Sequence, residues 1–271
     1  MPGFANRRDW CSTAYFHQCP VLSRSWHESA QTYARVAAAL EDFDQHAGQV
    51  ITLAAAGSLG RMEVLPHSDC DLIVIVPDDV APESDVAHDI MNAVWDRLEP
   101  LDLRLPKSWG IFVEPASIAS LTRPDDLGHL GDSRSNFGKR LQCLLDSQPL
   151  FRPERFRELQ QRILEWYATA FVESGHAKQW TYLLNDLIRY YRSYAAWQQF
   201  ELKVEHDDSW YIRNAKLRTS RLIMYAGMLL LLGESSRRQP RDKVTWLLER
   251  LGMTPLERVI WCMEQCTRGH G

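Results

Sequence analysis

The chain has 271 residues, of which 45% are hydrophobic and 24% are charged, as in a globular protein with a sizeable core. A net charge of -4 and a pI of about 6.1 argue against a nucleic-acid surface over the whole protein, although a local basic groove stays open. Residues 1–150 carry 12 Lys and Arg against 21 Asp and Glu, whereas residues 151–271 carry 19 against 14. An acidic half and a basic half fit a shared metal and phosphate site, but two separately solvated surfaces would give the same pattern.

The cysteine spacing and the apolar runs indicate in which cellular compartment the protein is expected. The six cysteines show no C-x-x-C spacing, and Cys262 and Cys266, four residues apart, are more typical of one helix face than of a zinc site. The longest apolar run, residues 222–232, is interrupted and too short to cross a bilayer. The first ten residues lack the apolar core of a signal peptide. We therefore expect a reduced, cytoplasmic protein without a membrane segment.

The hydrophobic pattern changes along the chain from mixed to purely helical. The first part predicts helices at 25–46 and 82–98, and strands at 50–56, 70–76, 101–105 and 110–114. From residue 137 onward only helices are predicted, at 137–145, 154–173, 178–203, 210–232, 241–251 and 255–267. Pro149 and Pro153 mark a boundary. We predict an α+β protein with a small mixed-sheet domain at 1–148, including an N-terminal helix, and an all-α helical bundle at 149–271.

One stretch, residues 54–76, has the residue types of a metal site. A Gly57-Ser58 turn follows the first predicted strand, and Asp69-Cys70-Asp71 opens the second. Because side chains alternate along a strand, Asp69 and Asp71 point the same way. Two adjacent carboxylates repel each other unless a cation lies between them, and a divalent metal is the usual one. The alternative is a solvated strand end.

The pattern Gly57-Ser58-x-x-Arg61-x-Glu63-x4-Ser68-Asp69-x-Asp71 resembles the signature of nucleotidyltransferases of the DNA polymerase β type. It is most similar to the PII-protein uridylyltransferase branch and its bacterial relatives. Three further stretches that resemble this branch are Leu105–Phe112, Leu184–Tyr190 and Arg213–Arg221. The resemblance covers roughly residues 50–232.

The resemblance implies transfer of a nucleoside monophosphate from a nucleoside triphosphate, with Mg²⁺ or Mn²⁺ as cofactor. It implies that Asp69 and Asp71 are metal ligands, and that Gly57 and Ser58 bind the β- and γ-phosphates. It also implies a third carboxylate on a neighbouring strand that helps to deprotonate the acceptor, for which Asp102 is the best candidate. For Ser58 the alternative is a helix cap, and for Asp102 it is an exposed residue paired with Arg104.

Arg61 can bind the nucleotide, but the favoured interpretation is that Arg61 forms a salt bridge with Glu63 and shapes the loop. In the helical part, polar side chains recur at helical spacing on two neighbouring predicted helices. These stripes consist of Asn185, Arg189 and Arg192, and of Asn214, Arg218, Arg221 and Tyr225. They can line a cleft that binds triphosphate, base or acceptor, with Arg189, Asn214, Arg218 and Arg221 as nucleotide ligands; a solvated, salt-bridged face is the alternative.

A Mg²⁺-dependent nucleotidyltransferase with a protein acceptor is therefore the function that the resemblance implies. Transfer to an RNA or tRNA end, or synthesis of a nucleotide messenger, is an alternative within the same chemistry. A non-catalytic nucleotide-binding regulator or toxin–antitoxin partner is another, and a glycosyltransferase metal motif is the weakest. The base and the oligomeric state are not specified by these patterns.

Overall fold

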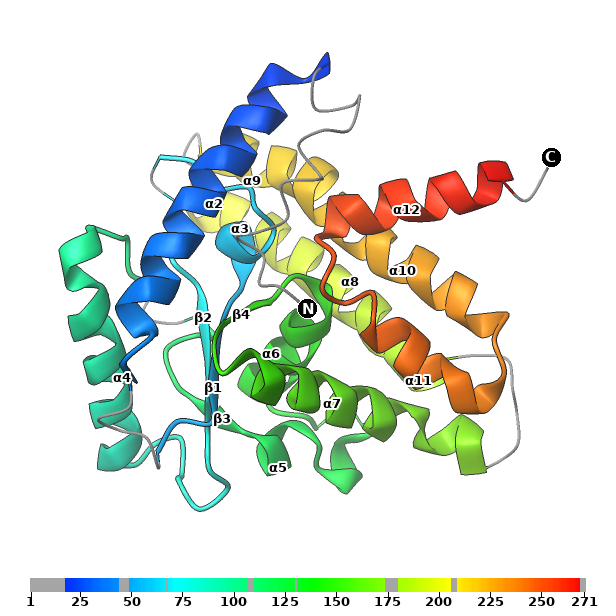
Figure 1. The fold of residues 1–271 in the computed structure, drawn as a ribbon, viewed down its shortest axis with the longest axis horizontal. Helices are drawn as coiled ribbons and strands as arrows, with labels where there is room; N and C mark the ends of the chain where they lie inside the picture. The colour runs from blue at the N-terminus through cyan, green and yellow to red at the C-terminus, as the bar shows by residue number, and fades with distance from the viewer. Residues whose placement is uncertain are drawn as a thin grey trace. The chain divides into compact units, whose positions relative to one another are not determined.

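The structure is a computed structural model that describes residues 18–43, 49–66, 68–106, 110–129, 131–173, 180–205 and 209–268. It has a mixed four-stranded sheet with helices in its N-terminal part and an all-helical C-terminal region, so the predicted α+β class is confirmed (Figure 1). The chain divides into two compact units. The first runs up to Arg123 and resumes at Ser133–Gln160, and the second comprises Pro124–Asp132 and Gln161 onward.

The sheet has the order β3-β2-β1-β4. Its strands are β1 (Thr52–Ala55), β2 (Leu72–Val76), β3 (Ala116–Ser117) and β4 (Gln148–Phe151). β1 pairs antiparallel with β2 and with β4, and β2 pairs parallel with β3. β2 is buried along its whole length, which explains its unbroken apolar sequence Leu-Ile-Val-Ile-Val.

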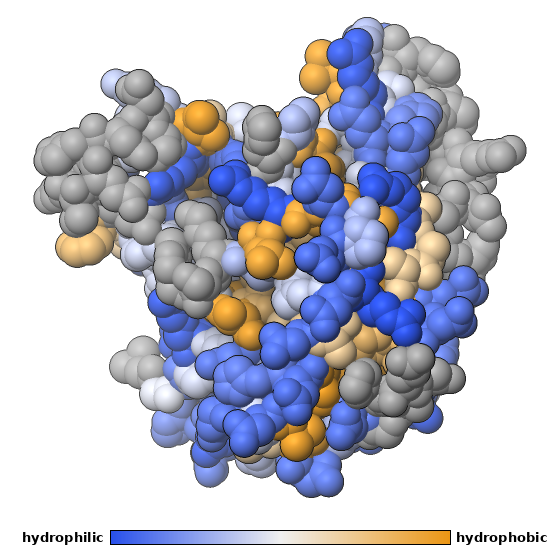
Figure 2. All heavy atoms as spheres, turned by 90° about the vertical axis from the view of Figure 1, so that its left-hand side faces the viewer, coloured by the Kyte–Doolittle hydropathy of each residue, from blue (hydrophilic) through white to orange (hydrophobic). Residues whose placement is uncertain are grey.

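Two helices cover one face of the sheet. Helix α2 (Pro20–Leu40) contributes Tyr33, Val36 and Leu40 to the core, and α4 (Asp85–Leu98) contributes Ile90, Met91, Val94 and Leu98. Those residues recur every three or four positions, so each helix buries one stripe. The outer side of α4 is polar, and Figure 2 shows this face of the molecule as mostly hydrophilic with small, separate apolar spots.

Helix α6 (Arg134–Leu145) lies on the other side of the sheet (Figure 1). Short elements complete the first unit: α3 (Gly57–Gly60), the 3₁₀ helix η4 (Glu99–Leu101), α5 (Ile118–Leu121) and the start of α7 (Pro153–Glu173). The predicted strand at 101–105 is wrong, because Leu101 ends η4 and Arg104 makes only an isolated bridge. The predicted strand at 110–114 is also wrong, since β3 lies at Ala116–Ser117.

Strand β4 was not predicted, because its second residue is Pro149. Proline has no N–H to give to a ladder and is tolerated in a strand mainly at the edge of a sheet. β4 has such an edge position, next to β1 alone. The strand belongs to the first unit, which therefore runs beyond residue 148, where the sequence pattern suggests a domain boundary.

The second unit consists of helices. They are η5 (Pro124–Asp126), the rest of α7, α8 (Thr181–Glu205), α9 (Ser209–Lys216), η6 (Leu217–Arg221), α10 (Leu222–Ser236), α11 (Pro240–Leu248) and α12 (Pro255–Arg268). Helices α10 and α12 pack closely at Gly227, where a Cβ would lie 2.6 Å from the carbonyl oxygen of Pro255. Arg258 is fully buried and donates to the carbonyl oxygens of Met253 (3.0 Å) and Leu251 (2.8 Å), which fixes the α11–α12 connection. None of the helices in the described part of the chain is both long and apolar enough to span a bilayer.

Candidate active site

The Gly57 turn and Asp71 are in direct contact. Gly57 follows β1 and has a φ of +62°, in the left-handed region that favours glycine. A Cβ at this position would overlap with Oδ2 of Asp71. The backbone N–H of Ala56 also donates to the carbonyl oxygen of Asp71, at 2.9 Å. Glycine is therefore required at residue 57 both by the backbone angle and by the carboxylate packed against it.

Asp69 and Asp71 flank a residue that points into the core. Cys70 is 3% exposed and belongs to the apolar cluster beneath α2 and α4, whereas both aspartates are half-buried. By the alternation of side chains, both carboxylates are directed away from that cluster. Burial, and then the charge of Asp71, raise the pKa of the Cys70 thiol to about 12. The thiol stays protonated at neutral pH, so the chemistry available here is that of the two carboxylates.

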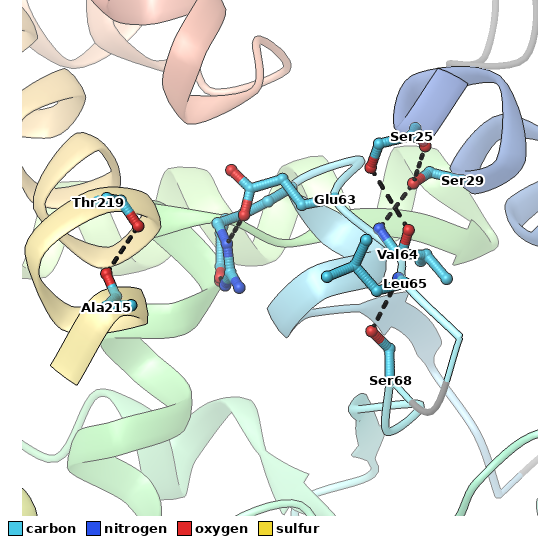
Figure 3. A network of polar contacts seen from close by, with 10 residues as sticks. Ser25, Ser29, Glu63, Val64, Leu65, Ser68, Ala215 and Thr219 are labelled. Atoms are coloured by element: carbon cyan, nitrogen blue, oxygen red, sulfur yellow. Dashed lines mark hydrogen bonds and ion pairs between the residues drawn. The ribbon is translucent and has the colours of Figure 1, made fainter. Parts of the chain in front are cut away.

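The segment between the turn and the aspartates is fastened to α2. The Val64 N–H donates to Ser29 Oγ at 2.8 Å, and Ser25 Oγ donates to the Val64 carbonyl at 3.4 Å (Figure 3). Further along, the Leu65 N–H donates to Ser68 Oγ at 3.0 Å, directly before Asp69. These bonds hold the loop so that the turn and the acidic pair keep one relative position.

Arg61 is part of a buried ion pair that the sequence patterns do not reveal. Its Nη1 lies 2.5 Å from Oδ2 of Asp146, and its Nε lies 3.0 Å from Oε2 of Glu63. Asp146 is fully buried at the end of α6. Burial works against the charge of the guanidinium, but Asp146 and Glu63 outweigh it and raise the pKa of Arg61 above its ordinary value. This arrangement supports the structural reading of Arg61 rather than its role as a nucleotide ligand.

Gly60, at the end of the turn, lies against the backbone of Asp146. A Cβ on Gly60 would overlap with the backbone oxygen of Asp146, so the end of α3 lies directly against the α6–β4 connection. Arg61 follows immediately and forms the ion pair to the same residue. Asp146 therefore packs its backbone against the turn and holds it through its carboxylate. The 85 residues that separate Arg61 from Asp146 leave no local sequence signal for this pair.

Asp102 does not join the acidic pair. It is exposed, follows η4 in a left-handed turn with a φ of +53°, and donates its N–H to the Glu99 carbonyl. Among the residues that the structure describes, no three His, Cys, Asp or Glu side chains come together to hold a metal. The expected position of Asp102 is therefore corrected, because the residue lies on a turn and not on the polar face of a strand; its role as a third metal ligand stays a prediction. Its expected partner, Arg104, lies next to Asp69 instead.

The remaining predicted ligands lie in the second unit, and each contacts a neighbouring side chain of that unit. Arg189 pairs with the buried Asp186 at 3.0 Å, and Asp186 also accepts from the Tyr167 hydroxyl at 2.8 Å. Arg218 donates to Asn214 Oδ1 at 3.2 Å. The Arg221 guanidinium lies over the ring of Tyr194, 4.9 Å from its centroid. Their role in nucleotide binding stays a prediction, because these contacts also suit a salt-bridged surface.

The polar stripe of the second unit is interrupted by a π-helical segment. Residues Leu217–Arg221 form η6, in which each turn is wider than in an α-helix. Thr219 Oγ1 donates to the Ala215 carbonyl at 2.7 Å within this stretch (Figure 3). Tyr225, which follows this segment on α10, is 5% exposed, and its ring centroid lies 4.9 Å from that of Tyr191. Tyr225 therefore belongs to the packed interior of the unit and not to an exposed polar stripe.

Comparison with known proteins finds similarity to one class of enzyme. Residues 18–111 match the family model described as "Putative nucleotidyltransferase DUF294". Over 148 residues the chain is 31% identical to the bifunctional uridylyltransferase/uridylyl-removing enzyme of Bordetella avium, a match that covers 50% of this chain and 16% of that protein. It is 39% identical over 75 residues to the protein of the same name from Corynebacterium glutamicum, covering 27% of this chain and 10% of that one. No solved structure matches the chain significantly.

The class of protein that the chain resembles is that of the nucleotidyltransferases, and the matched residues 18–111 include β1, β2, the glycine turn and the acidic pair. The similarity to the PII uridylyltransferases is distant and extends over half of the chain. The chain spans only a small share of the length of those relatives.

Proposed function

We propose that the chain is a Mg²⁺-dependent nucleotidyltransferase that moves a nucleoside monophosphate from a nucleoside triphosphate to an acceptor hydroxyl, with a protein side chain as the favoured acceptor. The observation that carries the proposal is the packing of Gly57 on the carboxylate of Asp71, which a single residue separates from Asp69. The contact joins a glycine turn, which suits phosphate binding, to an acidic pair, which suits a divalent cation. Neither feature alone would define this chemistry.

The donor set fits Mg²⁺ that arrives with its nucleotide. Mg²⁺ is commonly bound through one or two carboxylates together with substrate phosphates and water, rather than by an all-protein cage. Asp69 and Asp71 supply two half-buried carboxylates, and the described part of the chain shows no cluster of three His, Cys, Asp or Glu side chains. We therefore expect weak binding of the free metal and much tighter binding of the metal–triphosphate complex.

Each residue has a defined task in this proposal. Asp69 and Asp71 hold the metal, which supplies Lewis-acid stabilisation of charge on the phosphate oxygens. Gly57 lets the backbone approach the triphosphate, and the half-buried Ser58 hydroxyl is a donor to its oxygens. The attacking hydroxyl displaces pyrophosphate in line and loses its proton to solvent or to a base that the acceptor brings, because Asp102 lies outside the pair.

The test is an incubation of the protein with each α-³²P-labelled nucleoside triphosphate, Mg²⁺ or Mn²⁺, and cell lysate. Label that enters protein supports the proposal, and label in RNA or in a small molecule would redirect it to another acceptor. The Asp71→Asn variant is the control, since it keeps the shape of the side chain and removes its charge. Absence of label with all four nucleotides, or equal labelling by the variant, would refute the proposal.

A further inference from the structure

Backbone contacts place Arg104 beside the acidic pair. The Cys70 N–H donates to the Arg104 carbonyl at 2.8 Å, and Asp69 and Arg104 form an isolated parallel bridge. The segment after η4 is thereby fixed alongside Asp69 and Cys70. Any side chain at residue 104 would start from this position, next to the first carboxylate of the proposed metal site.

The side chain of Arg104 is largely exposed, and its ion pair with Asp69 is long. Nε lies 3.8 Å from Oδ1 of Asp69, at the long end of the range for an ion pair, and the side chain is 67% exposed. Asp69 itself is 33% exposed. Exposed pairs of this kind contribute little to stability, so the contact can be broken and remade at small cost.

The chemistry of this contact has two consequences. A guanidinium next to Asp69 neutralises the charge that would attract a divalent cation, so the two cations compete for the same carboxylate. Guanidinium also presents a planar fork of N–H donors that matches the oxygens of a phosphate. A residue that is displaced from Asp69 by a metal is therefore well suited to bind the triphosphate that accompanies the metal.

We propose that Arg104 is an exchangeable counter-ion of the metal site: it pairs with Asp69 in the metal-free protein and binds the phosphate oxygens when the metal–triphosphate complex enters. This inference rests on the proposed function. The fixed backbone keeps the guanidinium within reach of both partners, and the exposed side chain lets it change from one to the other.

The first test measures Mn²⁺ binding without nucleotide, by electron paramagnetic resonance of the free ion. Arg104→Gln should bind Mn²⁺ about two- to fivefold more tightly than the wild type, because the cation that competes for Asp69 is gone. Arg155→Gln is the matched control, since Arg155 is also exposed and ion-paired, with Glu158 at 2.8 Å. The control should bind Mn²⁺ as the wild type does.

The second test measures binding of inorganic tripolyphosphate with Mg²⁺ by calorimetry, which does not depend on the base. Arg104→Gln should bind it about tenfold more weakly, because a charge-assisted hydrogen bond is lost. Arg104→Lys should keep the competition for Mn²⁺ and recover only part of the tripolyphosphate affinity. Opposite changes for metal and for phosphate are the signature that a merely structural arginine would not give.

Two results separate this inference from the proposed function. If wild-type Mn²⁺ binding is lost in Asp69→Asn but is unchanged in Arg104→Gln, the exchange is refuted and the metal site stands. If the wild type shows no Mn²⁺ binding that depends on Asp69, with or without tripolyphosphate, both proposals fall together. Undiminished tripolyphosphate binding by Arg104→Gln would also overturn the exchange.

Discussion

The ion pair between Arg61 and Asp146 gives the sharpest stability prediction. In Asp146→Asn the carboxylate is lost, and Arg61 keeps its ion pair with Glu63, whose side chain is 32% exposed. Removing one partner of a buried pair costs about 3–5 kcal/mol, because the other charge stays buried. The remaining contact with Glu63 places the expected loss at the lower end, about 3 kcal/mol. For a domain of this size such a loss lowers Tm by about 6–12 °C.

The assay is thermal and urea unfolding followed by circular dichroism. Asp242→Asn is the matched control, because Asp242 is 59% exposed and pairs with Arg241 at 3.7 Å, so its loss should cost at most about 1 kcal/mol. The double variant Arg61→Met/Asp146→Leu should be more stable than Asp146→Asn, since it buries no unpaired charge. If Asp146→Asn melts with its control, or if the double variant is the least stable of the three, the buried-pair reasoning is wrong.

The remaining predictions concern the turn, the metal and a buried lysine. Gly57→Ala should abolish nucleotidyl transfer in the radiolabel assay, because the new Cβ overlaps with the carboxylate of Asp71 and the φ of residue 57 is positive. Gly131→Ala is the control and should leave transfer intact, because a Cβ at residue 131 meets nothing within 4 Å. Asp69→Ala should abolish transfer yet leave the metal-free melting temperature within about 2 °C of the wild type, because the half-buried acid serves a ligand rather than the fold; a larger drop in Tm would contradict this. Burial, partly offset by Glu114, lowers the pKa of Lys139 to about 8. Between about pH 8 and 10.5 this lysine is therefore neutral in the folded protein and protonated in the unfolded chain. The lysine therefore costs about 3 kcal/mol of stability below pH 8, and this cost disappears as the pH rises to 10.5. Lys139→Met should accordingly be more stable than the wild type at pH 7, with a difference in urea unfolding free energy that shrinks toward pH 10.5; a constant difference would refute the assignment.

The parts of the fold that sequence predicted are those with strong local patterns. The apolar run of β2 and the helical stripes of α2 and α4 depend on neighbouring residues, and the structure confirms these elements. The bounds of β2 and α4 agree within three residues, whereas α2 begins and ends five to six residues earlier than predicted. Strand β4 and the bridge at Arg104 depend on partners that are distant along the chain. The alternating run at 101–105 has a strand pattern, but Pro100 within η4 and the left-handed Asp102 prevent an extended segment.

The candidate site divides in the same way. The contact between Gly57 and Asp71 follows from two adjacent strands, and the signature predicted both residues. Asp146 and Arg104 could not be found, because each acts through a residue far along the chain and belongs to no motif. Asp102 was chosen for its place on an expected strand, so the loss of that strand removed the reason for choosing it.

The edge position of β4 has a practical consequence for cutting the chain. A fragment that ends at residue 148, where the proline pattern suggests a boundary, would lose most of this strand and leave β1 with one side unpaired. Exposed strand edges template pairing with other chains, and such a fragment would tend to aggregate. A fragment that continues to Gln160 would keep β4, and with it Pro149, whose missing N–H protects the outer edge of the sheet.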